Sequence, residues 1–220
     1  MFRMELPRET IDRVSQYWQD WAAQPVSNAV SVVTIGRQHF VSAPEPLRGR
    51  LGENPPTDLD GLLHLLSGEV SEVIGEACLA YADAVTLRLA STDGVIDIAA
   101  DDARVAAFQA VSDRNEWLEA SVEASDHRFG VVEDDVLVAV AGVQVWTDRI
   151  GHLRVFAAPA ARGRGLASKA ASGAIDLAVG RGLVPQWRSR RENRVSARVA
   201  DKLGFVSVGT QTYVRVKTTT

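Results

Sequence analysis

The chain has 220 residues, of which 46% are hydrophobic, so it can bury the core of one large or two small domains. Its longest apolar run, residues 136–146, is too short to span a bilayer, and we expect no membrane segment. The single cysteine, Cys78, excludes an internal disulfide framework and a cysteine-rich metal site, and we expect no bound metal.

The net charge of −4 conceals a division along the chain. Residues 149–220 hold 14 lysines and arginines against 3 acidic residues, whereas residues 1–148 hold 10 against 25. This asymmetry indicates that the C-terminal third meets an anion, although a solvated, arginine-rich helix face is the ordinary alternative. The start, residues 1–14, alternates in charge and lacks the apolar core of a signal peptide, so we expect a soluble cytoplasmic protein.

The first 82 residues mix helices and strands but carry no chemical signature. Residues 8–23 place Ile11, Val14 and Trp18 at helical spacing and predict an amphipathic helix. The predicted strands are 29–36 and its hairpin partner 38–44. The predicted loop is 44–58, and the predicted helices are 57–66 and 69–83, the second with Cys78 as a core residue.

From residue 84 onward, strands and helices follow a clearer order. The predicted strands are 84–90, 94–99, two within 127–146 that turn at residues 133–135, 151–158, 183–187, 205–209 and 212–217. The predicted helices are 101–112, 115–124, 163–179 and 193–203, the last two ending in glycines that suit a left-handed cap. This mixture predicts an α/β or α+β sheet rather than a helix bundle.

Residues 155–182 raise the question of function, because two glycines alternate with two arginines between an apolar run and a predicted helix. Gly163 and Gly165 let the backbone approach a phosphate, and the helix that follows has no obvious side-chain cap. Its N–H groups and dipole attract anions, and Arg162 and Arg164 add fixed charge. These features predict a pyrophosphate cradle. A plain turn is the alternative, because the lysine-serine/threonine ending of a P-loop and the third glycine of a dinucleotide fingerprint are missing.

Two segments, residues 153–175 and 190–205, resemble the GNAT acetyltransferase family. The family's acetyl-CoA motif, Arg/Gln-x-x-Gly-x-Gly/Ala after a strand and a proline, matches residues 162–167 behind Pro159. Its second motif, an asparagine and a helix ending in Leu-Gly-Phe, matches Asn193 and residues 203–205.

The resemblance spans residues 83–218. It implies a mixed, mostly antiparallel central sheet flanked by helices, in a GNAT acetyltransferase domain at residues 83–220. Residues 1–82 are similar only to the N-terminal extensions of some GNAT subgroups. We interpret them as an α/β extension, with a degenerate half-domain as one hypothesis.

The resemblance implies an acetyl-CoA-dependent N-acetyltransferase that transfers an acetyl group directly to a primary amine, with coenzyme A leaving as thiolate. The backbone of Val155, Phe156 and Ala157 is implied to pair with the pantetheine arm, and one of its N–H groups to stabilise the oxyanion. Asn193 is implied to face the pantetheine, with Ser196 one turn further. The pyrophosphate is implied to bind the N–H groups of Arg162, Gly163, Arg164, Gly165, Leu166, Ala167 and Ser168.

The catalytic residues follow the family pattern less closely. Where many members carry a tyrosine that protonates the thiolate, this chain has Ala200, so Tyr213 or solvent is the candidate acid. His152 is the most natural candidate base near neutral pH, with Asp148 beside it as the carboxylate alternative. An ordinary strand-end histidine is the competing interpretation of His152.

Two other functions compete with acetyl transfer. A non-catalytic acyl-CoA-binding or sensing domain is consistent with Ala200. Nucleic-acid binding through the arginines of residues 188–198 is disfavoured, because few aromatic residues interleave with them and the whole chain is acidic. The expected partners are therefore acetyl-CoA and an amine, not nucleic acid or a membrane, and a homodimer is left open.

Overall fold

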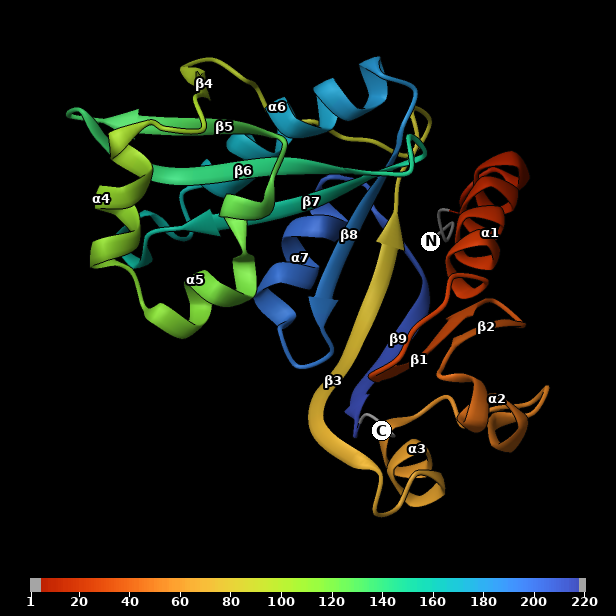
Figure 1. The fold of residues 1–220 in the computed structure, drawn as a ribbon. Coiled ribbons are helices and arrows are strands. Elements are labelled where there is room, and N and C mark those ends of the chain that lie inside the picture. The colour runs from red at the N-terminus through yellow and green to blue at the C-terminus, as the bar shows by residue number, and fades with distance from the viewer. Residues whose placement is uncertain (1–4, 218–220) are drawn as a thin grey trace. The chain divides into compact units, whose positions relative to one another are not determined.

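The computed structural model describes residues 5–217, which form two compact units (Figure 1). Unit 1 contains Tyr81–Trp187 and Ala197–Val206. Unit 2 contains Pro7–Ala80 and Arg188–Ser196 together with residues 207–217. Residues 1–4 and 218–220 lie outside the described part of the chain. Residues 1–4 belong to the segment 1–14, in which no signal peptide is expected.

Unit 1 is built on the strand order β8-β7-β6-β5-β4. Each neighbouring pair is antiparallel except β7 and β8, which are parallel. The strands are β4 (Val95–Ile98), β5 (His127–Glu133), β6 (Val136–Trp146), β7 (Ile150–Ala157) and β8 (Val184–Arg190, whose last three residues belong to unit 2). The expected mixed, mostly antiparallel sheet is confirmed.

Two tight turns join β5, β6 and β7 into a meander. Asp134 and Asp135 connect the first pair with positive φ angles of 48° and 61°, and Thr147 and Asp148 start the second turn at 50° and 55°. Short polar residues tolerate this left-handed backbone, which matches the twist of hairpin strands. The turn predicted at residues 133–135 is confirmed.

A β-bulge bends β6 near its start. Val131 pairs with Ala139 while Val132 pairs with Leu137, so Val138 is the extra residue. The Val138 carbonyl accepts a hydrogen bond from Ala158 N–H, just beyond the end of β7. The bulge also brings Leu137 and Val140 into the same core cluster despite their odd spacing.

Helices cover both faces of the unit 1 sheet. Helix α6 (Leu166–Gly180) packs on β5, β6 and β7, where Gly151 lies so close to Ala178 that an added Cβ would be 2.8 Å from it. The other face carries α4 (Ala103–Val111), α5 (Arg114–Ala120) and η1 (Val122–Ala124). There the rings of Phe108, Trp117 and Phe156 meet edge to face at 5.2–5.7 Å.

Unit 2 carries the strand order β2-β1-β9-β3. Its strands are β1 (Ala29–Ile35), β2 (Gln38–Ser42), β3 (Val70–Tyr81) and β9 (Val206–Val216). Two end residues of these strands, Tyr81 of β3 and Val206 of β9, belong to unit 1. Helix α1 (Arg8–Ala22) contacts β2. Helices α2 (Glu45–Leu51) and α3 (Leu59–Leu65) cover a core that includes Val30, Leu62 and Val214.

Several predicted elements are wrong. Residues 69–83 were expected to be helical but form β3, so Cys78 lies half-buried on a strand. Pairing in the sheet overrides the helix propensity of its glutamates and alanines, and burial alternates over Ala77, Leu79 and Tyr81.

The other differences have local causes. The predicted loop 44–58 contains α2, because proline is tolerated in a first helical turn and Leu47 and Leu51 are buried on one face. Residues 84–90 form no strand; Arg88 N–H donates instead to Leu203 O, after α7 (Arg194–Lys202). The two predicted closing strands are one strand, β9.

None of the helices within residues 5–217 has the length and hydropathy needed to cross a membrane.

The tightest glycine of unit 1 gives a stability prediction. Gly204 has φ +91°, and an added Cβ would lie 1.9 Å from the carbonyl oxygen of Thr86. Gly94 has φ +75° with open space around it, so it carries the same backbone strain without the collision. In urea denaturation we expect Gly94→Ala to cost about 1 kcal/mol and Gly204→Ala about 3 kcal/mol or more. Equal losses would contradict the packing of Gly204 on residue 86.

Candidate active site

The glycine-rich loop between β7 and α6 has a left-handed backbone. Gly163 and Gly165 have φ angles of 78° and 80°, a region that other residues enter only with strain. Both are exposed, and a Cβ added to either would meet no atom within 4 Å. The loop therefore presents bare backbone over open space.

Helix α6 begins at this loop without a side-chain cap. Its N-cap is Gly165, and Lys169 N–H donates to Gly165 O at 3.0 Å. The N–H groups of Leu166, Ala167 and Ser168 precede that bond and point out of the helix start. Because the helix is 15 residues long, its dipole adds to these donors, and the site suits an anion.

Both arginines of the loop are held by carboxylates. The Arg164 guanidinium donates two hydrogen bonds to Glu133, at 2.6 and 2.9 Å. Arg162 donates to Glu116 at 2.5 Å and to Ala157 O at 3.3 Å. The pairs fix the loop between the end of β5 and α5, so the structure gives these arginines a positioning role beside their charge.

The ion pair with Arg164 changes the pKa of the Glu133 carboxyl. Hydrogen bonds from Arg164 lower the pKa of the Glu133 carboxyl below its usual range. Since the folded-state pKa is lowered, the pair stabilises the fold above the ordinary pKa of glutamate and loses this contribution as the pH falls through the lowered value.

Strand β7 leaves one backbone edge open beside the loop. It pairs with β6 over its whole length, but with β8 only over Ile150–His152. Residues 153–157, which include Val155, Phe156 and Ala157, therefore pair with a neighbouring strand on the β6 side only, and the Ala157 carbonyl also accepts from Arg162 Nε at 3.3 Å. An extended chain placed against this edge would continue the sheet.

His152 lies where β7 and β8 part. It is opposite Gln186, the last pair of the register, and is only 6% exposed. His152 Nδ1 is 2.8 Å from Gln186 Oε1, and Gln186 Nε2 donates to the Tyr81 hydroxyl at 2.7 Å. Gln186 and Tyr81 are fully buried, so a polar chain crosses the sheet at this point.

The imidazole ring is also held from the β6 side. Trp146 stacks on His152 with 4.3 Å between ring centroids and 17° between planes. Its indole N–H donates to Gln144 Oε1, which also accepts from Arg154. Ring, indole and guanidinium therefore form one network on a single face of the sheet.

The remaining predicted site residues belong to other segments of the chain. Asp148 is exposed in the β6–β7 turn. Tyr213 is half-buried on β9 in unit 2, opposite Ser31. Asn193 and Ser196 also belong to unit 2, where Asn193 Oδ1 accepts from Ser196 N–H and caps α7. Ala200 of α7 is buried in unit 1 and offers no hydroxyl.

Sequence reasoning missed Gln186, Tyr81, Trp146 and Gln144. Gln144 and Gln186 were nevertheless visible as lone amides within apolar runs, a pattern that indicates a hydrogen-bonded buried group. Tyr81 gave no such signal, because its segment was assigned to a helix. The carboxylates that pair with the loop arginines, Glu116 and Glu133, were also not identified.

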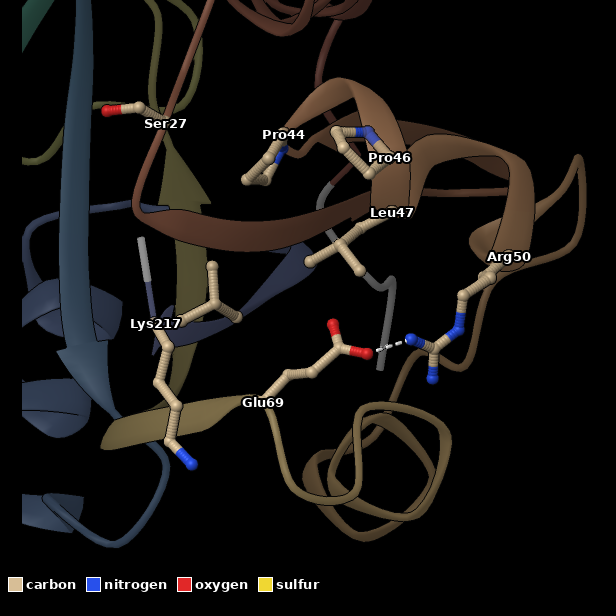
Figure 2. A pocket seen from close by; sticks show the side chains of 8 residues that line it. Ser27, Pro44, Pro46, Leu47, Arg50, Glu69 and Lys217 are labelled. Atoms are coloured by element: carbon tan, nitrogen blue, oxygen red, sulfur yellow. Dashed lines mark hydrogen bonds and ion pairs between the residues drawn. The ribbon is translucent and has the colours of Figure 1, made fainter. Parts of the chain in front are cut away.

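Unit 2 contains a cavity of its own, shown in Figure 2, of about 430 Å³. Pro44, Pro46, Leu47 and Val216 supply its apolar wall. Its two cationic side chains are already engaged, Arg50 with Glu69 and Lys217 with Gly68 O.

Within residues 5–217, no group of three or more His, Cys, Asp or Glu side chains is arranged to hold a metal ion.

Residues 92–205 match the sequence model of the Acetyltransferase (GNAT) family. A GNAT-family acetyltransferase structure from Novosphingobium aromaticivorans is 23% identical, with 73% of this chain and 80% of that chain covered and a TM-score of 0.54. One from Colwellia psychrerythraea is 14% identical, with 99% and 76% covered and a TM-score of 0.53. At these identities the structures establish the fold only. No curated protein matches the sequence significantly.

The Arg164–Glu133 pair can be tested by titration. Arg164→Met removes the guanidinium, and we expect the pKa of Glu133, followed by NMR of its carboxyl carbon, to rise toward its ordinary value. Asp102 is the internal control, because hydrogen bonds with Arg104 lower its pKa to about 2 independently of Arg164. An unchanged Glu133 titration would show that the pair does not hold the loop in solution.

Proposed function

The chain belongs to the GNAT acetyltransferase family, whose chemistry is acyl transfer from coenzyme A, and on this premise we propose that it is an acetyl-CoA-dependent N-acetyltransferase acting on a primary amine. The observation that carries the proposal is the bare left-handed loop leading into the uncapped start of α6. A pyrophosphate needs several converging N–H donors, and this backbone supplies them.

The residues present fit acetyl-CoA, which supplies the activated acetyl group as a thioester when bound. Backbone N–H groups from Gly163 to Ser168 would hold the pyrophosphate, whereas the Arg162 N–H, predicted to join them, already donates to Pro159 O at 3.2 Å. The open edge of β7, at Val155, Phe156 and Ala157, would pair with the pantetheine arm, which carries amide groups. An N–H on the same edge would stabilise the negative charge that develops on the thioester oxygen.

His152 is the base in this proposal, because it lies at the point where the open edge of β7 begins. It would take the proton of the attacking amine on its Nε2 atom. The new C–N bond then forms as the C–S bond breaks, and the electron pair leaves on the thiolate. With Ala200 at the position of the family's tyrosine, solvent or Tyr213 would protonate that thiolate.

The arginines of residues 188–198 are proposed to have no role in nucleic-acid binding. Arg191 lies 3.4 Å from the Glu76 carboxylate, so part of this charge is compensated within unit 2.

Binding at the loop can be tested with two glycines at opposite ends of α6. Gly165→Val places a branched side chain where the phosphate would approach. Gly182→Val is the matched control, because Gly182 also has a positive φ, of 71°, and open space around it. By calorimetry we expect Gly165→Val to weaken acetyl-CoA binding at least tenfold, about 1.4 kcal/mol, and Gly182→Val to leave it unchanged. Equal affinities for both variants would refute the assignment of the loop.

Catalysis can be tested by screening amines for acetyl-CoA-dependent release of free thiol. With an accepted amine, we expect kcat/KM to rise with pH to a plateau as His152 loses its proton. His152→Ala should lower kcat/KM by roughly 10²- to 10⁴-fold and remove that inflection, with unchanged acetyl-CoA affinity. His127→Ala, on β5, is the control.

An intact pH profile in His152→Ala would exclude His152 and make Asp148 the next candidate. If acetyl-CoA binds tightly but no amine ever releases thiol, the chain is an acyl-CoA-binding domain and not an enzyme.

A further inference from the structure

Gln186 is a fully buried amide within the otherwise apolar start of β8. A buried amide is costly unless both of its ends are hydrogen-bonded. Here Oε1 faces His152 Nδ1 at 2.8 Å, and Nε2 donates to the Tyr81 hydroxyl at 2.7 Å. With Nε2 donating to the Tyr81 hydroxyl, the amide presents its oxygen to His152.

The direction of the amide determines which nitrogen of His152 carries hydrogen. An amide oxygen can only accept, so the neighbouring Nδ1 must donate and must carry the hydrogen. In the neutral ring Nε2 then bears the lone pair. We propose that Gln186, oriented by Tyr81, is a positioning residue that fixes His152 in the tautomer whose Nε2 is basic.

Trp146 completes the arrangement by fixing the plane of the ring. Its indole lies nearly parallel to the imidazole, and its N–H is tied to Gln144 Oε1 at 3.0 Å. Gln144 lies opposite His152 in the β6–β7 register. Rotation of the imidazole out of its plane would break the stack, and a 180° flip of the ring would break the bond with Gln186, so the direction of Nε2 is set from two strands.

The ionisable side chains near this network are few and come from identifiable elements. Arg154 follows His152 on the same face of β7, and Tyr81 lies at the far end of the amide. Among the helices that contact β7, α5 and η1 contribute Glu116, Glu119 and Glu123, and α6, on the other face of the sheet, contributes Lys169 and Asp176. None of these groups is altered in the Gln186 variants below, so their influence is common to all the proteins compared.

The role of Gln186 rests on the proposed function of His152 as base, but the tautomer can be measured without any substrate. The probe is the full chain with ¹⁵N-labelled histidine, examined by long-range ¹H–¹⁵N correlation above the titration of the ring. The chain has 4 histidines, and His152→Gln identifies the signals of His152 by their loss. We expect His152 to be protonated at Nδ1 and unprotonated at Nε2.

Two substitutions separate the hydrogen bond from simple packing. Gln186→Leu removes the acceptor, and we expect the ring to change to the Nε2–H form and kcat/KM for the amine to fall at least tenfold. Gln186→Glu keeps an acceptor, so the Nδ1–H form should persist. Its carboxylate should also raise the pKa of the imidazole and move the midpoint of the pH–rate profile upward. Acetyl-CoA affinity should be unchanged in both.

Gln211→Leu is the matched control. Gln211 is another buried glutamine, hydrogen-bonded to Ser31 on the neighbouring strand of unit 2, and its loss should leave the His152 tautomer and kcat/KM unchanged.

The outcomes distinguish the two proposals. An Nε2–H ring in the wild-type protein, or an unchanged tautomer in Gln186→Leu, would overturn the role of Gln186 whatever the activity. An Nδ1–H ring together with full activity in His152→Ala would instead overturn the function of His152 as base. Tyr81→Phe should weaken the tautomer preference less than Gln186→Leu does, since the amide oxygen remains.

Discussion

The site depends on the short parallel pairing between β7 and β8. The two strands are joined over Ile150–His152 only, and β7 then continues for five residues paired on the β6 side alone. At the spacing of a parallel strand, those residues expose about 17 Å of backbone edge. A fully paired β7 would offer no donors or acceptors to a ligand, so the binding edge exists because the pairing stops.

One segment of the chain then supplies each part of the site in order. His152 lies at the point of separation, the open edge follows, and the glycine-rich loop and the start of α6 come next. The ion pairs of Arg162 and Arg164 hold that loop against α5 and β5. The same α5 places Trp117 against Phe156 of β7, so core packing and loop position are coupled through one helix.

The parts of the site that depend on local sequence could be predicted. The left-handed glycines, the uncapped helix and the hairpin turns follow from residue types within a few positions of each other. The apposition of His152 and Gln186 could not be predicted in this way, because it depends on the register of two strands 34 residues apart. The contact with Tyr81 was further hidden because residues 69–83 have a helical composition, and only pairing in the sheet makes them a strand.

The most direct test of the proposed site is amide hydrogen exchange with and without coenzyme A, measured residue by residue. Binding at the open edge and the helix start predicts slower exchange at residues 153–157 and at residues 162–168, with little change in α4. Protection confined to other parts of the chain, with both of these segments exchanging as fast as in the free protein, would contradict the assignment of the site.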